Sequence, residues 1–197
     1  EQLNRQGKSL KFAMNSGIYE PGFLPTGLHI ADGKTVVKLN LKDHVKKRPD
    51  DLTPNVYLKP NGVFFIRADG KSAGVLESHE FSRSGETPIL ATQSGPLLVN
   101  RGKIHPAFNE PSTSRLIRNG VGVTKNGTVV LVCSDRTPGK GQINLYGFAE
   151  LFRDKLGCPS ALYLDGDISD VFIRGVTGPV PDTNWFAGVL GIVEEKK

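Results

Sequence analysis

The chain has 197 residues, 38% of them hydrophobic and 23% charged, a composition typical of folded globular proteins that excludes a disordered or fibrous chain. The net charge is +5, but the basic run at residues 46–48 contains no aromatic side chain and is followed by Asp50 and Asp51, so we expect no nucleic-acid partner. The longest apolar run, residues 129–133, is far shorter than the ~20 residues of a membrane-spanning helix, so no transmembrane segment is expected.

Short strands joined by tight turns are predicted along most of the chain. The 23 glycines and 13 prolines suit many turns better than a helix bundle. Asn-Gly and Asp-Gly pairs beside β-branched residues are strong local signals for hairpins. They predict pairing of 27–31 with 35–39, of 62–67 with 73–76, and of 120–125 with 128–134. Further strands are predicted at 89–92, 97–99, 161–164, 171–173 and 188–193.

One principal helix is predicted at about 144–157. Asn144 can cap it, apolar residues recur at three- and four-residue spacing from Leu145 to Leu156, and Gly157 ends it. A second helical turn is expected within 40–48. The sequence therefore predicts an α+β fold, a single domain over 1–197 in which a twisted, mainly antiparallel sheet packs against this helix.

Known nucleotide and metal patterns fail on this sequence. The Gly-Lys-Ser/Thr tripeptides at 33–35 and 70–72 lack the glycine five positions earlier that a phosphate-binding loop needs. We therefore expect no cofactor. The four histidines are scattered, which does not suit zinc. Asp165, Asp167 and Asp170 could hold a hard cation, but their spacing is not that of a helix-loop-helix calcium site, and we expect no metal.

Four segments place polar side chains beside glycine at expected strand ends, where a backbone can approach a ligand closely. They are residues 14–17, 91–96, 114–122 and 162–169. In this order and with these intervals they resemble the phosphodiester glycosidase family, over a core of about 12–193. The stretches 57–64 and 156–166 resemble a bacterial envelope subgroup in particular.

The resemblance implies hydrolysis of the bond between a sugar anomeric carbon and a phosphodiester oxygen, which releases free sugar and a phosphomonoester. The implied partner is a small anionic sugar phosphodiester or an envelope glycan. The chain opens with Glu1 and no initiator Met, as a processed chain would, and we expect a periplasmic or extracellular location. The implied catalytic residues are Arg118 and Asp165. The implied substrate-binding residues are Asn15, Gly17, Ser94, Gly95, Gly166, Asp167 and Ser169.

The chemistry of these residues suits that reaction. The planar fork of Arg118 can meet two phosphate oxygens. A phosphomonoester with a second pKa of about 6 leaves without strong protonation, so one essential carboxylate suffices. Asp165 would attack the anomeric carbon or activate water, with Asp167 or Glu20 as a possible second carboxylate. This hypothesis requires Arg118 and Asp165 to face one pocket.

The sequence departs from the family pattern beside both catalytic candidates. Asp167 and Ile168 stand before Ser169 where the family commonly has two glycines, and Asn119 follows Arg118 where it commonly has threonine. Two alternatives stay open: a non-catalytic protein that binds anionic glycans, and a metal-dependent phosphodiesterase built on the aspartates of 165–170.

Several residues outside these motifs admit two interpretations. Cys133 and Cys158 could form a disulfide or stay as two buried thiols. Trp185 and Phe186 could stack on a sugar face or fill the core, and the core is favoured. His105 is expected on the surface.

Overall fold

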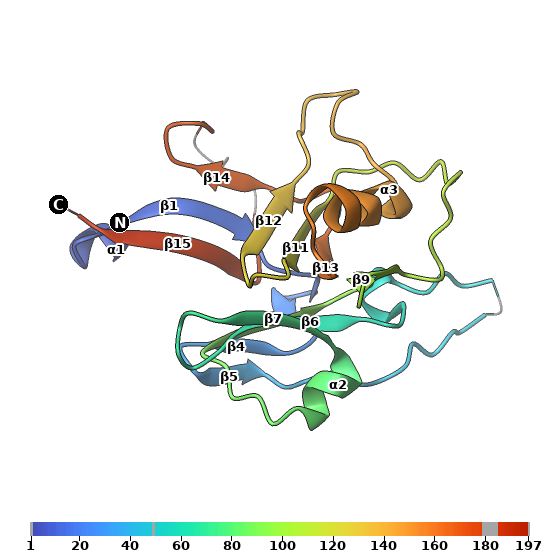
Figure 1. The fold of residues 1–197 in the computed structure, drawn as a ribbon, viewed down its shortest axis with the longest axis horizontal. Helices are drawn as coiled ribbons and strands as arrows, with labels where there is room; N and C mark the ends of the chain where they lie inside the picture. Colours follow the sequence, from blue (N-terminus) through green and yellow to red (C-terminus); the bar gives the residue numbers. More distant parts are fainter. Residues whose placement is uncertain (1, 49, 179–184, 197) are drawn as a thin grey trace.

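The computed structural model describes residues 2–48, 50–178 and 185–196. Two five-stranded antiparallel sheets lie one above the other at its centre (Figure 1). The upper sheet has the order β10-β9-β13-β11-β12, with bounds Lys103–Ile104, Leu97–Asn100, Ser160–Asp165, Asn119–Val123 and Val129–Cys133. The lower sheet has the order β5-β4-β8-β6-β7, with bounds Lys34–Val37, His29–Ala31, Leu90–Ser94, Gly62–Ile66 and Ala73–Glu77.

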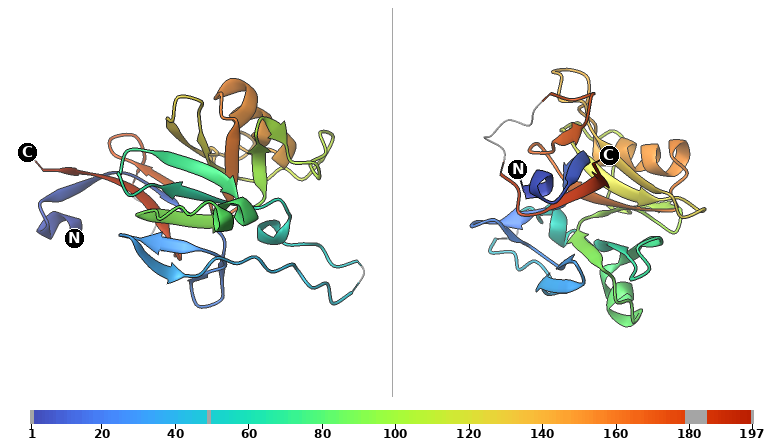
Figure 2. Two further views of the ribbon diagram at one scale, coloured as in Figure 1. Left: turned by 60° about the horizontal axis from the view of Figure 1, so that its bottom comes forward. Right: turned by 90° about the vertical axis from the view of Figure 1, so that its left-hand side faces the viewer.

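Smaller elements surround the two sheets. An outer sheet of order β14-β1-β15 extends to one side and carries both ends of the described chain (Figures 1 and 2). Its bounds are Val171–Ile173, Lys8–Asn15 and Val189–Glu195. A short hairpin follows β1, with β2 at Tyr19–Glu20 and β3 at Leu24–Pro25. The short helices are α1 at Gln2–Arg5, α2 at Ser78–Arg83 and a 3-10 turn at Asn55–Tyr57.

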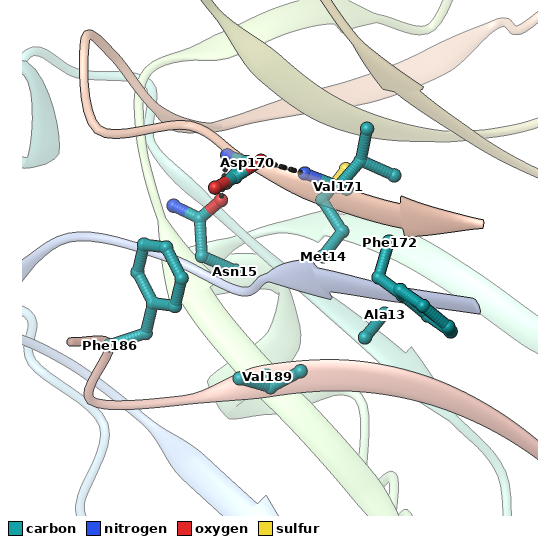
Figure 3. A pocket seen from close by; sticks show the side chains of 8 residues that line it. All are labelled: Ala13, Met14, Asn15, Asp170, Val171, Phe172, Phe186 and Val189. Carbon is teal, nitrogen blue, oxygen red and sulfur yellow. Dashed lines mark hydrogen bonds between the residues drawn. The ribbon is translucent and has the colours of Figure 1, made fainter. Parts of the chain in front are cut away.

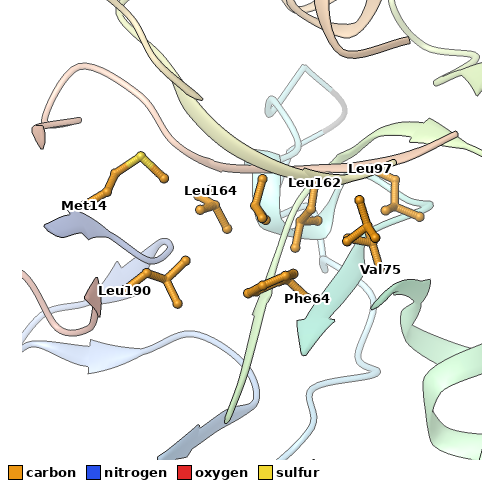
Figure 4. Packing of buried hydrophobic residues seen from close by; sticks show 9 residues of the cluster. Met14, Phe64, Val75, Leu97, Leu162, Leu164 and Leu190 are labelled. Atoms are coloured by element: carbon orange, nitrogen blue, oxygen red, sulfur yellow. The ribbon is translucent and has the colours of Figure 1, made fainter. Parts of the chain in front are cut away.

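The main core fills the space between the upper and lower sheets (Figure 4). Met14 and Leu190 of the outer sheet close one end of this core. The two large sheets supply its other buried members, Phe64, Val75, Leu97, Val121, Val123, Leu162 and Leu164. Because Met14 is buried in this core, Asn15 lies beside the end of β13 and the start of β11 in the upper sheet.

The principal helix covers the outer face of the upper sheet. It begins as α3 at Leu145–Glu150 and continues as a π-helical turn at Leu151–Lys155. The side chain of Asn144 caps it by accepting a hydrogen bond from the Gly147 N–H at 2.8 Å. Phe148 and Phe152 are buried under it against the upper sheet. The predicted helix is confirmed, and it leads directly into β13.

Glycines in β11 let this helix approach the sheet. A Cβ at Gly122 would lie 2.8 Å from the Sγ of Cys158 and 2.8 Å from the ring of Phe152. Both neighbours are fully buried, so neither can move aside without disturbing the core.

Gly122→Ala is therefore expected to lower the free energy of unfolding by about 1–3 kcal/mol through overpacking. Gly178→Ala is the matched control, because a Cβ there meets none of the described residues within 4 Å, and its effect should stay within about 0.5 kcal/mol. Urea unfolding of both variants measures the difference. Equal stability of the two would contradict the close packing of β11 against the helix.

The predicted α+β class and antiparallel pairing are confirmed, and all three predicted hairpins form. The helical turn expected at 40–48 is wrong, because the segment is extended. Asn40 instead exchanges hydrogen bonds with the side chain of Gln93, giving its N–H to Oε1 at 2.9 Å and accepting from Nε2 at 2.6 Å. The second bond occupies the Asn40 carbonyl, which would accept a backbone N–H four residues later in a helix that began there.

Three residues with open interpretations are placed by the structure. Cys133 and Cys158 are both free thiols. The surface position expected for His105 is wrong: its ring is buried, stacks on Phe108 with centroids 4.8 Å apart, and accepts a hydrogen bond from a backbone N–H. Within the described residues, no helix has the length and apolar character to cross a membrane.

Candidate active site

Three strand ends from different parts of the chain meet around Asn15. β1 ends at Asn15, β13 ends at Asp165, and β11 begins at Asn119, which stands opposite Asp165 in the sheet register. The Asn15 amide donates to the Asp165 carboxylate at 2.9 Å. The Asn119 amide donates to the side-chain oxygen of Asn15 at 2.7 Å. All three side chains are buried, so Asn15 is held in one orientation with its N–H aimed at Asp165.

Asp165 is a buried carboxylate held by neutral donors. Besides Asn15, it accepts a hydrogen bond from the backbone N–H of Gly166 at 2.8 Å, and no ion pair with it occurs in the described part of the chain. Burial raises its pKa to about 6, against the lowering effect of its two hydrogen bonds. A carboxylate that titrates near 6 is suited to take up a proton at neutral pH.

This raised pKa makes a prediction about stability. An unfolded Asp165 ionises near its ordinary pKa of 3.8 and the folded one near 6, so stability present below pH 4 is lost as the pH rises through 6. Relative to Asp165→Asn, which does not titrate, the wild type should lose about 2 kcal/mol of unfolding free energy between pH 4 and pH 7. Urea unfolding at both pH values measures this. A difference between the two proteins that does not change with pH would contradict it.

Arg118 is also buried, just before β11, and faces the helix side of the sheet. Its Nε donates to the Ile143 carbonyl at 2.7 Å and its Nη2 to the Ser114 carbonyl at 3.1 Å. Its Nη1 lies 3.5 Å from the Tyr163 hydroxyl. Among the described residues, one N–H on each terminal nitrogen has no protein acceptor. Arg118 lines a cavity of about 110 Å³ together with Tyr146 and others.

Tyr163 lies between the two predicted catalytic groups. The charges of both Arg118 and Asp165 act on the pKa of its hydroxyl, which burial raises to about 12. A Cβ at Gly166 would lie 2.9 Å from the same hydroxyl. Arg118 thus contacts Tyr163, and Asp165 is near enough for its charge to act on the same hydroxyl. Asp165 does not line the small cavity of Arg118, so that cavity is not the common pocket that the hypothesis requires.

Open space adjoins Asn15 on its other side. A cavity of about 160 Å³ is lined by Asn15, Asp170 and Phe186 (Figure 3). The backbone N–H of Asp170 donates to the Asn15 side-chain oxygen at 3.1 Å. A larger hollow of about 690 Å³ begins at Asp170 and includes Arg136, whose Nη1 donates to the Ser169 carbonyl at 2.6 Å. An anionic ligand would find a cation there that sequence reasoning missed.

The remaining predicted residues divide into buried and exposed groups. Ser94 gives its hydroxyl to the Leu164 carbonyl at 2.9 Å, and a Cβ at Gly17 would lie 3.5 Å from Ser94. Ser94 therefore links β8 to β13, and Gly17, two residues after β1, lies against β8. Ser169 is fully buried, and its hydroxyl has no hydrogen-bond partner in the described residues. Asp167 and Glu20 are exposed.

Two other predicted positions have definite surroundings. Gly95 packs against Asn61, where a Cβ would come within 2.6 Å of the asparagine side chain. The described residues contain no group of three His, Cys, Asp or Glu side chains that could hold a metal ion. Asp165, Asp167 and Asp170 therefore do not form such a ligand set, which removes the geometric basis of the metal-dependent alternative.

Sequence reasoning missed the positioning residues Asn119 and Tyr163. Asn119 is spaced by two residues from Val121 and by four from Val123, and both valines are core residues on one face of β11. A polar residue in phase with two core valines was the available signal. Tyr163 lies on the same, helix-facing side of β13 as Ala161. Nothing in the sequence indicated that its hydroxyl would lie beside the site.

A model of the phosphodiester glycosidase family matches residues 8–189, so the chain belongs to that family and the resemblance seen in the sequence is confirmed. The chain is 36% identical over 179 residues to the uncharacterized protein YigE of Escherichia coli (strain K12), a match covering 91% of the chain. It spans 63% of the length of that protein, less than two thirds.

A solved structure also shares the fold. It is the catalytic domain of zebrafish N-acetylglucosamine-1-phosphodiester alpha-N-acetylglucosaminidase, auto-inhibited by its pro-peptide. The TM-score is 0.59 at 19% sequence identity, over 95% of this chain and 63% of that one. At this identity the likeness concerns the fold.

Proposed function

We propose that the protein hydrolyses the glycosidic bond of a sugar-1-phosphodiester and releases free sugar and a phosphomonoester. Family membership supports the reaction class. The observation that carries the proposal is the buried Asp165, which accepts hydrogen bonds from Asn15 and Gly166 and whose pKa burial raises to about 6. A periplasmic or extracellular location and an envelope substrate stay predictions.

In this proposal each charged group has a separate task. Above pH 6 Asp165 is mainly ionised, which is the form that attacks the anomeric carbon or takes a proton from water. Arg118 would use its two unpaired N–H groups on the phosphate oxygens, where negative charge grows as the bond breaks. Because the phosphomonoester is a good leaving group, the site needs no strong acid, and the exposed Asp167 and Glu20 are not required.

Product analysis in oxygen-18 water tests this reaction. The substrate is an aryl phosphodiester of N-acetylglucosamine. A glycosidase places the heavy oxygen on the sugar, whereas a phosphodiesterase places it on phosphate. Label on the sugar supports the proposal. Label on phosphate, or binding of the substrate without any product, overturns it.

A further inference from the structure

Three aromatic rings gather on the surface close to the candidate site. Tyr19, Phe23 and Trp185 form this aromatic platform. The rings of Tyr19 and Phe23 have centroids 5.5 Å apart and planes inclined by 28°, and those of Phe23 and Trp185 have centroids 6.1 Å apart and planes inclined by 43°. Trp185 is 69% exposed and Phe23 49% exposed. The core position favoured for Trp185 from the sequence is therefore wrong.

The backbone under the platform is strained. Phe23 has a φ of +58°, in the turn between β2 and β3. A bulky side chain rarely adopts this conformation, and glycine or asparagine would be favoured there. Phe23 gains little from burial at this position. Local strain of this kind concentrates at functional sites, so the exposed ring itself is the feature to be explained.

The platform is tied to the candidate site from both sides. Tyr19 follows Asn15 by four residues, which limits their separation to about 14 Å. Phe186, the neighbour of Trp185, lines the cavity beside Asn15 (Figure 3). The Tyr19 hydroxyl donates to the Trp185 carbonyl at 3.1 Å. The platform therefore adjoins the Asn15 cavity through Phe186 and lies within reach of a ligand that extends from Asn15.

We infer that the aromatic platform binds a pyranose ring of a glycan that continues from the scissile sugar phosphodiester. The choice of a sugar rests on the proposed function. One face of a pyranose carries mainly C–H groups, which pack flat on aromatic rings while the hydroxyls stay in water. An exposed apolar cluster beside a polar site is a common form of ligand surface. The substrate is accordingly an oligosaccharide or polymer.

The chain contains one tryptophan, so its fluorescence reports on the platform alone. The titration uses tetra-N-acetylchitotetraose and maltotetraose with the Asp165→Asn variant, which prevents turnover. We expect a blue shift, protection of Trp185 from iodide quenching, and at least tenfold weaker binding in Phe23→Ala. Calorimetry gives the same comparison for Trp185→Ala. Leu52→Ala, at a 90% exposed position, is the matched control and should bind as the parent does.

A second measurement separates binding from folding. Phe23→Gly removes both the ring and the strain, so it should weaken glycan binding without lowering the melting temperature. Retained glycan binding in Phe23→Gly or Trp185→Ala would overturn the inference.

The remaining outcomes separate this inference from the proposed function. Hydrolysis of the small aryl substrate by the wild type, with no binding of either tetrasaccharide, would overturn the platform and leave the proposed function standing. Tetrasaccharide binding at the platform, without hydrolysis of the aryl substrate, would overturn the proposed function and leave the platform as a glycan-binding surface. A fluorescence shift with phosphatidylethanolamine–phosphatidylglycerol vesicles but not with tetrasaccharides would identify a membrane surface as the ligand of the platform. Dimerisation that is lost in Trp185→Ala would identify a second copy of the chain. Either result would overturn the inference.

Discussion

Asp165→Asn is expected to lower kcat on the aryl phosphodiester of N-acetylglucosamine by about 10²–10⁴-fold, the usual contribution of a positioned acid or base. The asparagine keeps the shape of the side chain but cannot ionise, so it neither attacks carbon nor takes a proton from water. Its carbonyl oxygen can still accept a hydrogen bond from Asn15. We therefore expect KM to change little, because the loss falls on the reacting group and not on substrate binding.

The control is Asp32→Asn, the same chemical change at an exposed turn. Asp32 has a φ of +49°, a conformation that asparagine tolerates well, so the variant should keep wild-type kcat and stability. Steady-state kinetics at pH 7, with circular dichroism of each variant, make the comparison. An Asp165→Asn enzyme with a tenth or more of wild-type kcat would show that Asp165 is not the reacting carboxylate.

Elements coded by neighbouring residues were predictable from the sequence. The turn at Asn126 and Gly127 and the cap at Asn144 specify a hairpin and a helix with local interactions alone. The segment 40–48 was not predictable in this way. Its extended form depends on Gln93, more than 50 residues away, and no local pattern announces such a partner. Strand β1 was missed for a similar reason, because it forms between two strands from the far end of the chain.

The candidate site shows the same division. Asn15 and Asp165 carry recognisable motifs, and the structure joins them by one hydrogen bond. Asn119 occupies a position where the sequence departs from the family pattern, and it is the residue that orients Asn15. The depth of Arg118 could not be predicted either, since it depends on carbonyls of Ile143 and Ser114 that fold over it. The motifs were enough to name the candidate catalytic residues, but their orientation depends on backbone groups that are distant in the sequence.

The burial of Arg118 decides how its role must be tested. Removing the whole side chain would leave the Ser114 carbonyl without its donor and the Ile143 carbonyl with the Leu116 N–H alone. An unsatisfied buried group costs about 1–3 kcal/mol, so Arg118→Ala would mix unfolding with catalysis. Arg118→Lys keeps the charge and most of the volume but loses the planar fork. We expect it to lower kcat by about 10²–10³-fold, as the loss of a donor to a developing anion does.

Inhibition by the two products separates phosphate recognition from a structural role. If Arg118 contacts the phosphate, the Arg118→Lys enzyme should bind the aryl phosphate product about 10–100-fold more weakly, the equivalent of a hydrogen bond to a charged group. Its affinity for free N-acetylglucosamine should be unchanged. Arg83→Lys is the matched control, since Arg83 is exposed at the end of α2, and both affinities should stay at the wild-type value. Equally weakened binding of both products in Arg118→Lys would mean that Arg118 supports the fold around Tyr163. Another cation would then contact the phosphate, and Arg136 in the open hollow is the candidate.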